Sequence, residues 1–443
     1  MSEAQTAARL LRKPTLPLPE PLRAAEEPSF THYSVVTRLP EIARRTLAEN
    51  PFPPEIAARI QALIDEIPHG KIRPIVLPDS DGSGTSKRGH SNNESADWSA
   101  WTAPYLGQDW LQAPWFFIEE YFYIRILEAT GYFGRGDWER RDPYTDQKRL
   151  GLVSERARLR ALAANVQNTL AFDPSEWQDG LTRLLLADLW GNQSDLSLWP
   201  VKHGETSHHA AAHEAHSRTG GAALEHVLSN DLDALMDYLE GIVPAETRID
   251  ILLDNAGYEL AADLALADYL LESGRAAQVR LHAKTHPVFV SDALEKDIFA
   301  TLDYLVFEGH LAAHAMAVRL RSRLVDGRLR IQHHPFWTSP LAMWDMPGDL
   351  VQELRDSSLL ISKGDANYRR LLGDLHWPNE TPFSAVMDYL PFALLALRTL
   401  KSEITLGIPP ERVPADDAQW MTNGRWGLIQ FAPPSGRDPA VTI

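Results

Sequence analysis

The sequence contains no cysteine among its 443 residues. This absence excludes disulfides, thiolate metal sites and cysteine nucleophiles together, so any metal must be held by oxygen or imidazole ligands. It also favours a reducing compartment, and we expect a cytoplasmic protein. Positive charge is scarce as well, since 43 Lys and Arg stand against 60 Asp and Glu, giving a formal net charge of -17. We therefore expect a small-molecule substrate and neither a nucleic-acid nor a membrane partner.

Long apolar runs are also missing. The first residues, MSEAQTAARLLRKP, lack the apolar centre of a secretory signal. The most apolar early stretch, 115–132, contains Glu119, Glu120 and Arg125, which predicts a buried helix and not a membrane span. The remaining composition, 44% hydrophobic and 23% charged, is typical of a globular protein with two domains or one capped domain.

The spacing of apolar residues divides the chain into regions. Residues 1–30 are rich in Pro, Ala and Glu, which predicts a mobile N-terminal arm. Residues 31–202 place apolar side chains three and four positions apart, as in PEIAARIQALIDEI, which predicts a mainly helical region. Residues 203–221 are small, polar and His-rich, which predicts a flexible loop.

Residues 222–443 alternate short apolar runs with helical segments. The runs are RIDILLDN, QVRLHAK, SLLISKGD and FALLALRT, and AGYELAADLALADYLLESG is one of the helical segments. This alternation predicts a mostly parallel sheet flanked by helices. The predicted fold class is therefore α/β, with a three-layer α/β/α domain that binds metal and substrate, preceded by the mainly helical region.

Acidic and amide side chains follow the first two runs. Asp254 and Asn255 end the first run with Glu259 one helical turn later, and the second leads through HPVFVSD to Asp292. In open α/β sheets, ligands bind outside the carboxyl ends of the strands. Oxygen ligands of this kind suit a hard divalent cation such as Mg or Mn. Helix capping is the alternative explanation for an Asp or Asn at such a position.

Basic side chains follow the other two runs. Lys363 and Arg369 belong to the third, and Arg398 and Lys401 to the fourth. Lys and Arg bind phosphate oxygens, and the acidic and amide residues after the first two runs suit a metal. Together the four run ends predict hydrolysis of phosphate esters by a metal-activated water. Asp365 or Glu259 is predicted to orient this water. The predicted catalytic residues are Asp254, Asn255, Asp292 and Asp365. The predicted substrate-binding residues here are Asp254, Asn255, Glu259, Lys363, Asp365, Asn367, Arg369, Arg398 and Lys401.

Several of these segments resemble one known family. LLDNAGYELAADLALADYLL, PVFVSDA, PFWTSPLAMWDMP, LISKGDANYRRLLGD and RTLK are similar to the damage-control phosphatase family, also called the domain-of-unknown-function eighty-nine type. The resemblance extends through WGNQSDLSLWP and covers roughly residues 185–431. RTLK is typical of the sugar-phosphate subgroup with an RTxK motif. Some members are also described as acidic-residue methyltransferases.

The resemblance implies roles for individual residues. Asp254, Asn255 and Asp292 look like the ligands of a divalent metal, namely Mn, Co, Ni or Mg. The segment 365–369 resembles the substrate-binding loop, and Lys401 resembles the sugar-phosphate anchor. The implied activity is hydrolysis of fructose 1-phosphate and related sugar phosphates.

The methyltransferase description implies other contacts. Glu259 and Asp292 would contact S-adenosylmethionine, and Asn192 and Asp195 belong to a neighbouring motif that we include among the substrate-binding residues. An S-adenosylmethionine-dependent protein-glutamate carboxyl methyltransferase is therefore the alternative function. No GxGxxG loop follows RIDILLDN, which favours hydrolysis. A non-catalytic binding protein ranks last, because every position expected to hold a metal ligand carries a suitable residue.

Two further patterns have simpler explanations. DSDGS at 79–83 is similar to an aspartyl-phosphate signature, but the flanking prolines and the Ser/Gly composition favour a loop. His209, His213 and His216 have the separations of zinc ligands on one helix face. Their Ala- and Gly-rich setting favours a surface loop instead.

Overall fold

A computed structural model describes residues 11–77, 94–191 and 221–436. The predictions for DSDGS, for Asn192 and Asp195 and for the His-rich loop therefore lie outside the described residues. The division into separate domains remains a prediction. None of the described helices combines the length and hydropathy that a bilayer crossing requires.

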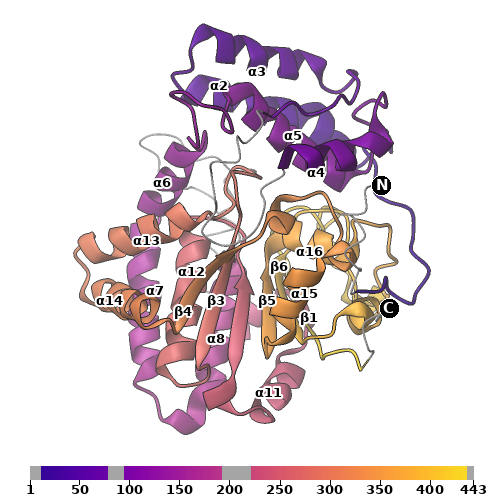
Figure 1. Ribbon diagram of the computed structural model, residues 1–443. Coiled ribbons are helices and arrows are strands. Elements are labelled where there is room, and N and C mark those ends of the chain that lie inside the picture. The colour runs from indigo at the N-terminus through magenta and orange to yellow at the C-terminus, as the bar shows by residue number, and fades with distance from the viewer. Residues whose placement is uncertain (1–10, 78–93, 192–220, 437–443) are drawn as a thin grey trace.

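A seven-stranded sheet forms the centre of the α/β part, in the order β1-β7-β6-β5-β2-β3-β4 (Figure 1). Strands β2 to β6 are parallel to one another, β7 is antiparallel to β6, and β1 is parallel to β7. The strands are β1 (Val227–Asn230), β2 (Arg248–Leu252), β3 (Gln278–Ala283), β4 (Leu329–His333), β5 (Leu359–Lys363), β6 (Leu394–Thr399) and β7 (Gly427–Ala432). The predicted class, α/β with a mostly parallel sheet after a helical region, is confirmed.

The four predicted apolar runs form β2, β3, β5 and β6. All residues of β2, β5 and β6 are buried, because helices cover both faces of the sheet. Alternate side chains of a strand enter different cores: Ile249 and Ile251 face one, and Leu252 faces the other. The apolar runs are therefore continuous and not alternating.

One face of the sheet is covered by four long helices that share a single hydrophobic core. They are α7 (Arg156–Leu170), α8 (Trp177–Gly191), α12 (Tyr258–Glu272) and α14 (Leu311–Asp326). Helix α12 is central, and every one of its residues except the last is buried. The other described α-helices of the α/β part are α10 (Gly221–Leu224), α11 (Leu232–Glu240), α13 (Glu295–Phe307), α15 (Gly348–Arg355), α16 (Gly364–Leu372) and α17 (Phe383–Val386).

A helical cap lies over one end of the sheet, at the top of Figure 1. It contains α1 (Phe30–Tyr33), a π-helix (Ser34–Arg38), α2 (Leu39–Glu49), α3 (Pro54–Glu66), α4 (Glu94–Thr102) and α5 (Trp115–Thr130), and α6 (Thr145–Ser154) connects it to the α/β part. Helix α5 is buried except at Glu128, which confirms the predicted buried helix. Its buried charges are paired, Arg125 with Glu66 and Glu120 with Arg370.

The described part of the predicted N-terminal arm is packed against the protein. Leu11 and Leu22 are buried, and the backbone N–H of Leu22 donates to Asp374 O at 3.0 Å. Trp115 N in turn donates to Leu22 O at 2.8 Å. Residues 11–29 therefore join the cap to the loop after α16, where composition alone indicates a free arm.

Candidate active site

The candidate site lies where the order of the strands reverses. The chain moves outward from β2 through β3 to β4, and then returns to form β5 on the other side of β2. The crevice at the carboxyl ends of two such strands is the usual ligand site of an open α/β sheet. Here Asp254 and Asn255 follow β2, and Gly364 and Asp365 follow β5.

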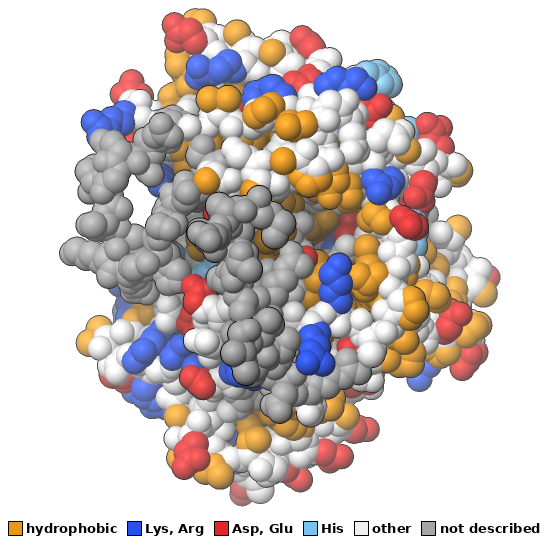
Figure 2. Space-filling model, turned by 45° about the vertical axis from the view of Figure 1, so that its right-hand side comes forward, with side chains coloured by type: hydrophobic (Ala, Val, Ile, Leu, Met, Phe, Trp, Pro, Cys, Tyr) orange, Lys and Arg blue, Asp and Glu red, His pale blue; other side chains and the backbone are white. Residues whose placement is uncertain are grey.

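A cleft with an empty volume of about 430 Å³ opens at this point. Its walls come from the cap and from the strand ends, and Figure 2 shows the molecule hollowed below the cap with hydrophobic side chains around the hollow. The lining residues are Phe30, Arg38, Trp115 and Glu119 of the cap, Asp254, Asn255, Phe289 and Asp292 near the ends of β2 and β3, and Asp365, Ala366, Arg369 and Lys401 after β5 and β6.

Backbone pairing brings the predicted metal ligands together. Asn255 and Asp292 form an antiparallel bridge, because Ala256 N donates to Ser291 O at 2.6 Å and Ala293 N donates to Asp254 O at 2.7 Å. In this arrangement the two bridged residues lie opposite each other with their side chains close. The Asn255 amide also donates to Asp254 Oδ2 at 2.8 Å. The side chains of Asp254, Asn255 and Asp292 thus line the cleft as neighbours.

The loop that supplies Asp292 has an unusual backbone. Phe289 and Val290 have φ values of 48° and 66°, in the left-handed region that β-branched residues such as valine avoid. The bend is fixed by Ser291, whose N–H donates to Phe289 O at 2.8 Å and whose hydroxyl donates to Asn255 Oδ1. Backbone strain of this kind concentrates at functional sites. Here it places Phe289 in the cleft wall and Asp292 beside Asn255.

A glycine allows the Asp254 carboxylate to lie against the start of α16. Gly364 has φ +80°, and a Cβ atom there would lie 1.8 Å from Asp254 Oδ2. No other residue fits this position without moving the carboxylate. The close approach of β2 and β5 at the switch point therefore depends on Gly364.

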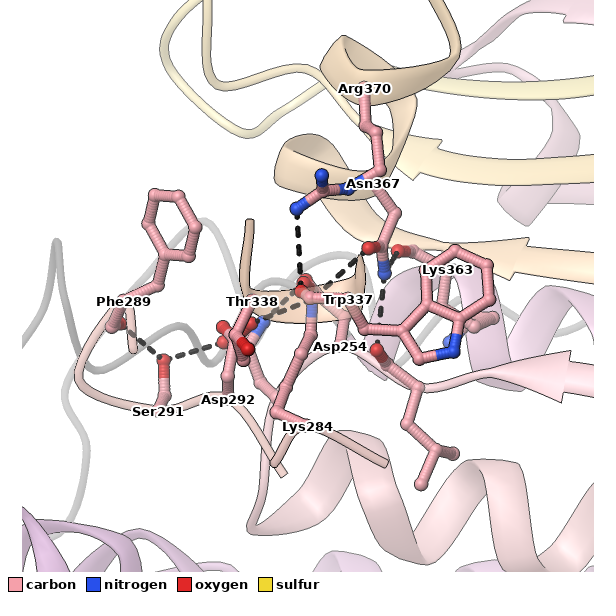
Figure 3. A network of polar contacts seen from close by, with 12 residues as sticks. Asp254, Lys284, Phe289, Ser291, Asp292, Trp337, Thr338, Lys363, Asn367 and Arg370 are labelled. Carbon is pink, nitrogen blue, oxygen red and sulfur yellow. Dashed lines mark hydrogen bonds and ion pairs between the residues drawn. The ribbon is translucent and has the colours of Figure 1, made fainter. Parts of the chain in front are cut away.

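Lys284 and Asn367 hold the ends of the strands together (Figure 3). The Lys284 ammonium lies 3.0 Å from Asp292 Oδ2 and donates to Asn367 Oδ1 at 3.1 Å. The Asn367 amide donates to Leu253 O at 3.1 Å and to Lys363 O at 2.9 Å. Asn367 is thus used by the protein itself and does not line the cleft.

Behind the cleft, Lys363 lies among three carboxylates. Its fully buried ammonium lies 2.6 Å from Asp188, 3.1 Å from Asp263 and 3.3 Å from Glu259. Burial raises the pKa of Asp263 well above its usual range, and the Asp188 carboxylate raises it further. Glu259 also accepts from the Asn255 amide at 2.8 Å. Lys363 therefore acts on the cleft through Glu259 and Asn255, and does not line it.

Arg398 is likewise buried and holds Asp365 in place. Its guanidinium lies 2.7 Å from Asp365 Oδ1 and 4.4 Å from the centre of the Tyr368 ring. Asp365 Oδ1 also accepts from the Ser402 hydroxyl at 3.0 Å. Asp365 and Lys401 line the cleft, whereas Arg398 lies behind them.

The cap wall contributes residues that the sequence patterns do not identify. Glu119 accepts hydrogen bonds from Arg38 of the π-helix and from Arg369 of α16. Arg369 also contacts Asp374 at 2.7 Å and lies 3.5 Å from the centre of the Trp115 ring. The available signal was Glu119 itself, because a carboxylate within an apolar helix needs a buried partner.

The structure divides the predicted site residues into three groups. The first lines the cleft: Asp254, Asn255, Asp292, Asp365, Arg369 and Lys401. The second lies behind it: Glu259, Lys363, Asn367 and Arg398. The third, Asn192 and Asp195, lies outside the described residues.

The donor set fits a hard divalent cation. The carboxylate residues Asp254 and Asp292 and the amide residue Asn255 line the cleft, and oxygen ligands of these kinds suit Mg and Mn. In the part of the chain that the structure describes, no group of three or more His, Cys, Asp or Glu side chains is arranged to hold a metal. The predicted set has only two such residues, because its third ligand is Asn255.

Fold and site together define an α/β protein with a capped, charged cleft at the switch point of a parallel sheet. Residues 33–415 match the model of the damage-control phosphatase ARMT1-like domain. The chain belongs to this family, whose phosphatase activity is a hydrolysis that implies a small phosphate substrate.

Three relatives illustrate the similarity, each named damage-control phosphatase ARMT1. The chain is 31% identical to that of Danio rerio over 343 residues, which cover 73% of this chain and 75% of the relative. It is 33% identical to that of Mus musculus over 340 residues, with the same shares covered. For the protein of Homo sapiens the identity is 32% over 345 residues, covering 73% and 76%.

Proposed function

We propose that the chain is a divalent-metal-dependent phosphatase of small sugar phosphates of the fructose 1-phosphate type. The observation that carries this proposal is the meeting of oxygen ligands and cations in one cleft. Asp254, Asn255 and Asp292 lie on one side, and Arg369 and Lys401 line the same space. A metal ion activates the attacking water, and Lys or Arg groups stabilise the charge on the phosphoryl oxygens.

The cleft residues have different roles in this proposal. Asp254, Asn255 and Asp292 would hold Mn, Co, Ni or Mg, which when bound polarises a phosphoryl oxygen and lowers the pKa of a water molecule. The Lys401 ammonium binds phosphate oxygens. Asp365, fixed by Arg398, orients the attacking water.

The buried residues position this machinery. Lys284 holds the Asp292 carboxylate, and Lys363 holds Glu259, which in turn holds the Asn255 amide. Partners of this kind fix the orientation of metal ligands. We therefore assign Lys363, and likewise Arg398, to positioning and not to substrate contact. Asn192 and Asp195 remain predicted substrate-binding residues.

The methyltransferase alternative is less well supported by the geometry. It assigns Glu259 to S-adenosylmethionine, yet both carboxylate oxygens of this buried residue are in contact with protein. One accepts from Lys363 at 3.3 Å and the other from Asn255 at 2.8 Å. Hydrolysis needs no change in these contacts.

The decisive experiment compares both activities in one preparation. Metal-stripped protein is incubated with fructose 1-phosphate and Mn, Co or Ni, and released phosphate is measured beside a methyl-transfer assay. We expect metal-dependent phosphate release, its loss in Asp254→Ala, and normal release in the control Asp356→Ala, which alters an exposed carboxylate on α15's C-terminal side. Absence of phosphate release with every metal would contradict the proposal.

A further inference from the structure

The cap wall of the cleft combines hydrogen-bond donors, an acceptor and aromatic rings. Arg38 and Glu119 provide the polar groups, and Phe30 and Trp115 provide the rings. All four come from the cap, whereas the predicted metal ligands come from the strand ends. The cap wall therefore faces the part of a substrate that is not the phosphate.

Arg38 is held firmly but retains hydrogen-bonding capacity. Its Nε donates to the Ser34 hydroxyl at 3.1 Å, and its Nη2 donates to Glu119. Among the residues that the structure describes, Nη1 has no hydrogen-bond partner. The side chain is 12% exposed, whereas that of Glu119 is fully buried. The guanidinium is thus fixed in direction and open toward the cleft.

Glu119 joins this arginine to helix α16. One of its carboxylate oxygens binds Arg38 and the other binds Arg369, whose guanidinium packs on the Trp115 ring. A guanidinium group has five N–H donors, so its bond to Glu119 leaves Arg38 with donors for a ligand in the cleft that it lines. Trp115 and the nearby Phe30 add apolar surface for C–H groups.

We propose that Arg38, oriented by Glu119, is a specificity-determining residue that binds hydroxyl groups at the non-phosphate end of the substrate. The substrate class that fits is a polyhydroxylated phosphate monoester, since hydroxyl groups match the guanidinium donors and the sugar carbons match the aromatic rings. A phosphate ester without hydroxyl groups can contact the rings but offers no hydroxyl partner to the Arg38 guanidinium. This inference rests on the proposed phosphatase function.

The test compares two substrates in the same metal-loaded enzyme. Kinetic constants for fructose 1-phosphate and for p-nitrophenyl phosphate are measured with wild type, Arg38→Ala, Arg38→Lys and Glu119→Gln. We expect Arg38→Ala to lower kcat/KM for the sugar phosphate about 10- to 100-fold, mainly through KM, because a hydrogen bond from a charged group is lost. For the aryl ester we expect a change of less than about threefold. Arg38→Lys should restore part of the sugar selectivity.

Controls separate specificity from folding and from the proposed function itself. Arg44→Ala removes an exposed arginine from the same cap and should leave both substrates unaffected. Equal losses on the two substrates in Arg38→Ala and Glu119→Gln would mean that the pair is only structural, and would overturn the inference while the phosphatase function stands. A wild-type protein that is inactive on both esters would overturn the proposed function, and the inference with it.

Discussion

The buried cluster around Lys363 allows a quantitative prediction. Replacement of Lys363 by Met leaves Asp188 and Glu259 without their counter-ion in a fully buried site. Opposite charges about 4 Å apart attract by about 4 kcal/mol at an effective dielectric constant of about 20. Removal of one partner of a buried pair typically costs about 3–5 kcal/mol. We expect Lys363→Met to lower the free energy of unfolding by that amount at pH 7.

Asp263 provides the matched comparison within the same cluster. Burial and the nearby Asp188 hold its pKa well above the usual range, which favours the neutral form of this carboxyl. Asparagine has nearly the same shape and is also neutral, and its oxygen still accepts from Lys363. We therefore expect Asp263→Asn to cost less than about 1 kcal/mol, below the several kcal/mol of a lost buried charge pair.

The way in which the stability of each variant changes with pH is an independent test. A carboxyl whose pKa is raised in the folded protein stabilises it at pH values below the unfolded pKa, and this stability is lost as pH rises toward the folded pKa. In Lys363→Met the remaining carboxylates lose their counter-ion. The loss of unfolding free energy of this variant relative to wild type should therefore shrink as pH falls from 7 to 5. Asp263→Asn lacks the raised group, so its stability relative to wild type should improve as pH rises.

Urea denaturation of the three proteins between pH 5 and 8 measures these differences through the transition midpoints. Near-equal losses in Lys363→Met and Asp263→Asn at pH 7 would show that Asp263 is charged and would refute this account of the cluster. A deficit of Lys363→Met that does not change with pH would refute it as well.

Three further predictions concern the cleft. Asp254→Asn should reduce kcat at least about 100-fold and weaken the stabilisation of the protein by manganese in thermal unfolding; unchanged stabilisation would place the metal elsewhere. Gly364→Ala should lower both kcat and the melting temperature, because its Cβ would meet Asp254 Oδ2, whereas Gly274→Ala, with a similar φ of +70° and open space, should lower only the melting temperature. Lys401→Ala should raise KM for the sugar phosphate with a smaller change in kcat, and an unchanged KM would indicate a structural lysine.

The strands that could be predicted from the sequence are mainly those that are buried on both faces. β2, β5 and β6 are buried on both faces and appear in the sequence as continuous apolar runs. β4 lies at the edge of the sheet and mixes buried with exposed residues in LRIQH, so it carries no comparable signal. β1 has only four residues, and β7 gains its place by antiparallel pairing with β6. Such pairing depends on distant segments and leaves little local pattern.

For the site, the sequence predicted which residues follow the strands but not the direction in which their side chains point. Sequence position identified which residues follow the strands, and Asp254, Asp292 and Lys401 indeed line the cleft. It did not show that Lys363, one residue before Gly364, points to the opposite side and into a buried carboxylate cluster. The direction of the Lys363 side chain depends on packing against α8 and α12. Arg38 lies more than 200 positions from the strand ends, so only the folded chain brings it to the cleft.

The long reach of the cap contacts has a consequence for the synthesis of the protein. Phe30 N donates to a carboxylate oxygen of Glu403 at 2.8 Å, across 373 positions of sequence. A nascent chain therefore exposes Asp254, Asn255 and Asp292 to the cell long before Lys401 and Glu403 have left the ribosome. During this interval the proposed metal ligands exist without Lys401, the proposed phosphate anchor. The cleft can be completed only after Lys401 has emerged, and a chain truncated before this residue should lack that part of the cleft wall.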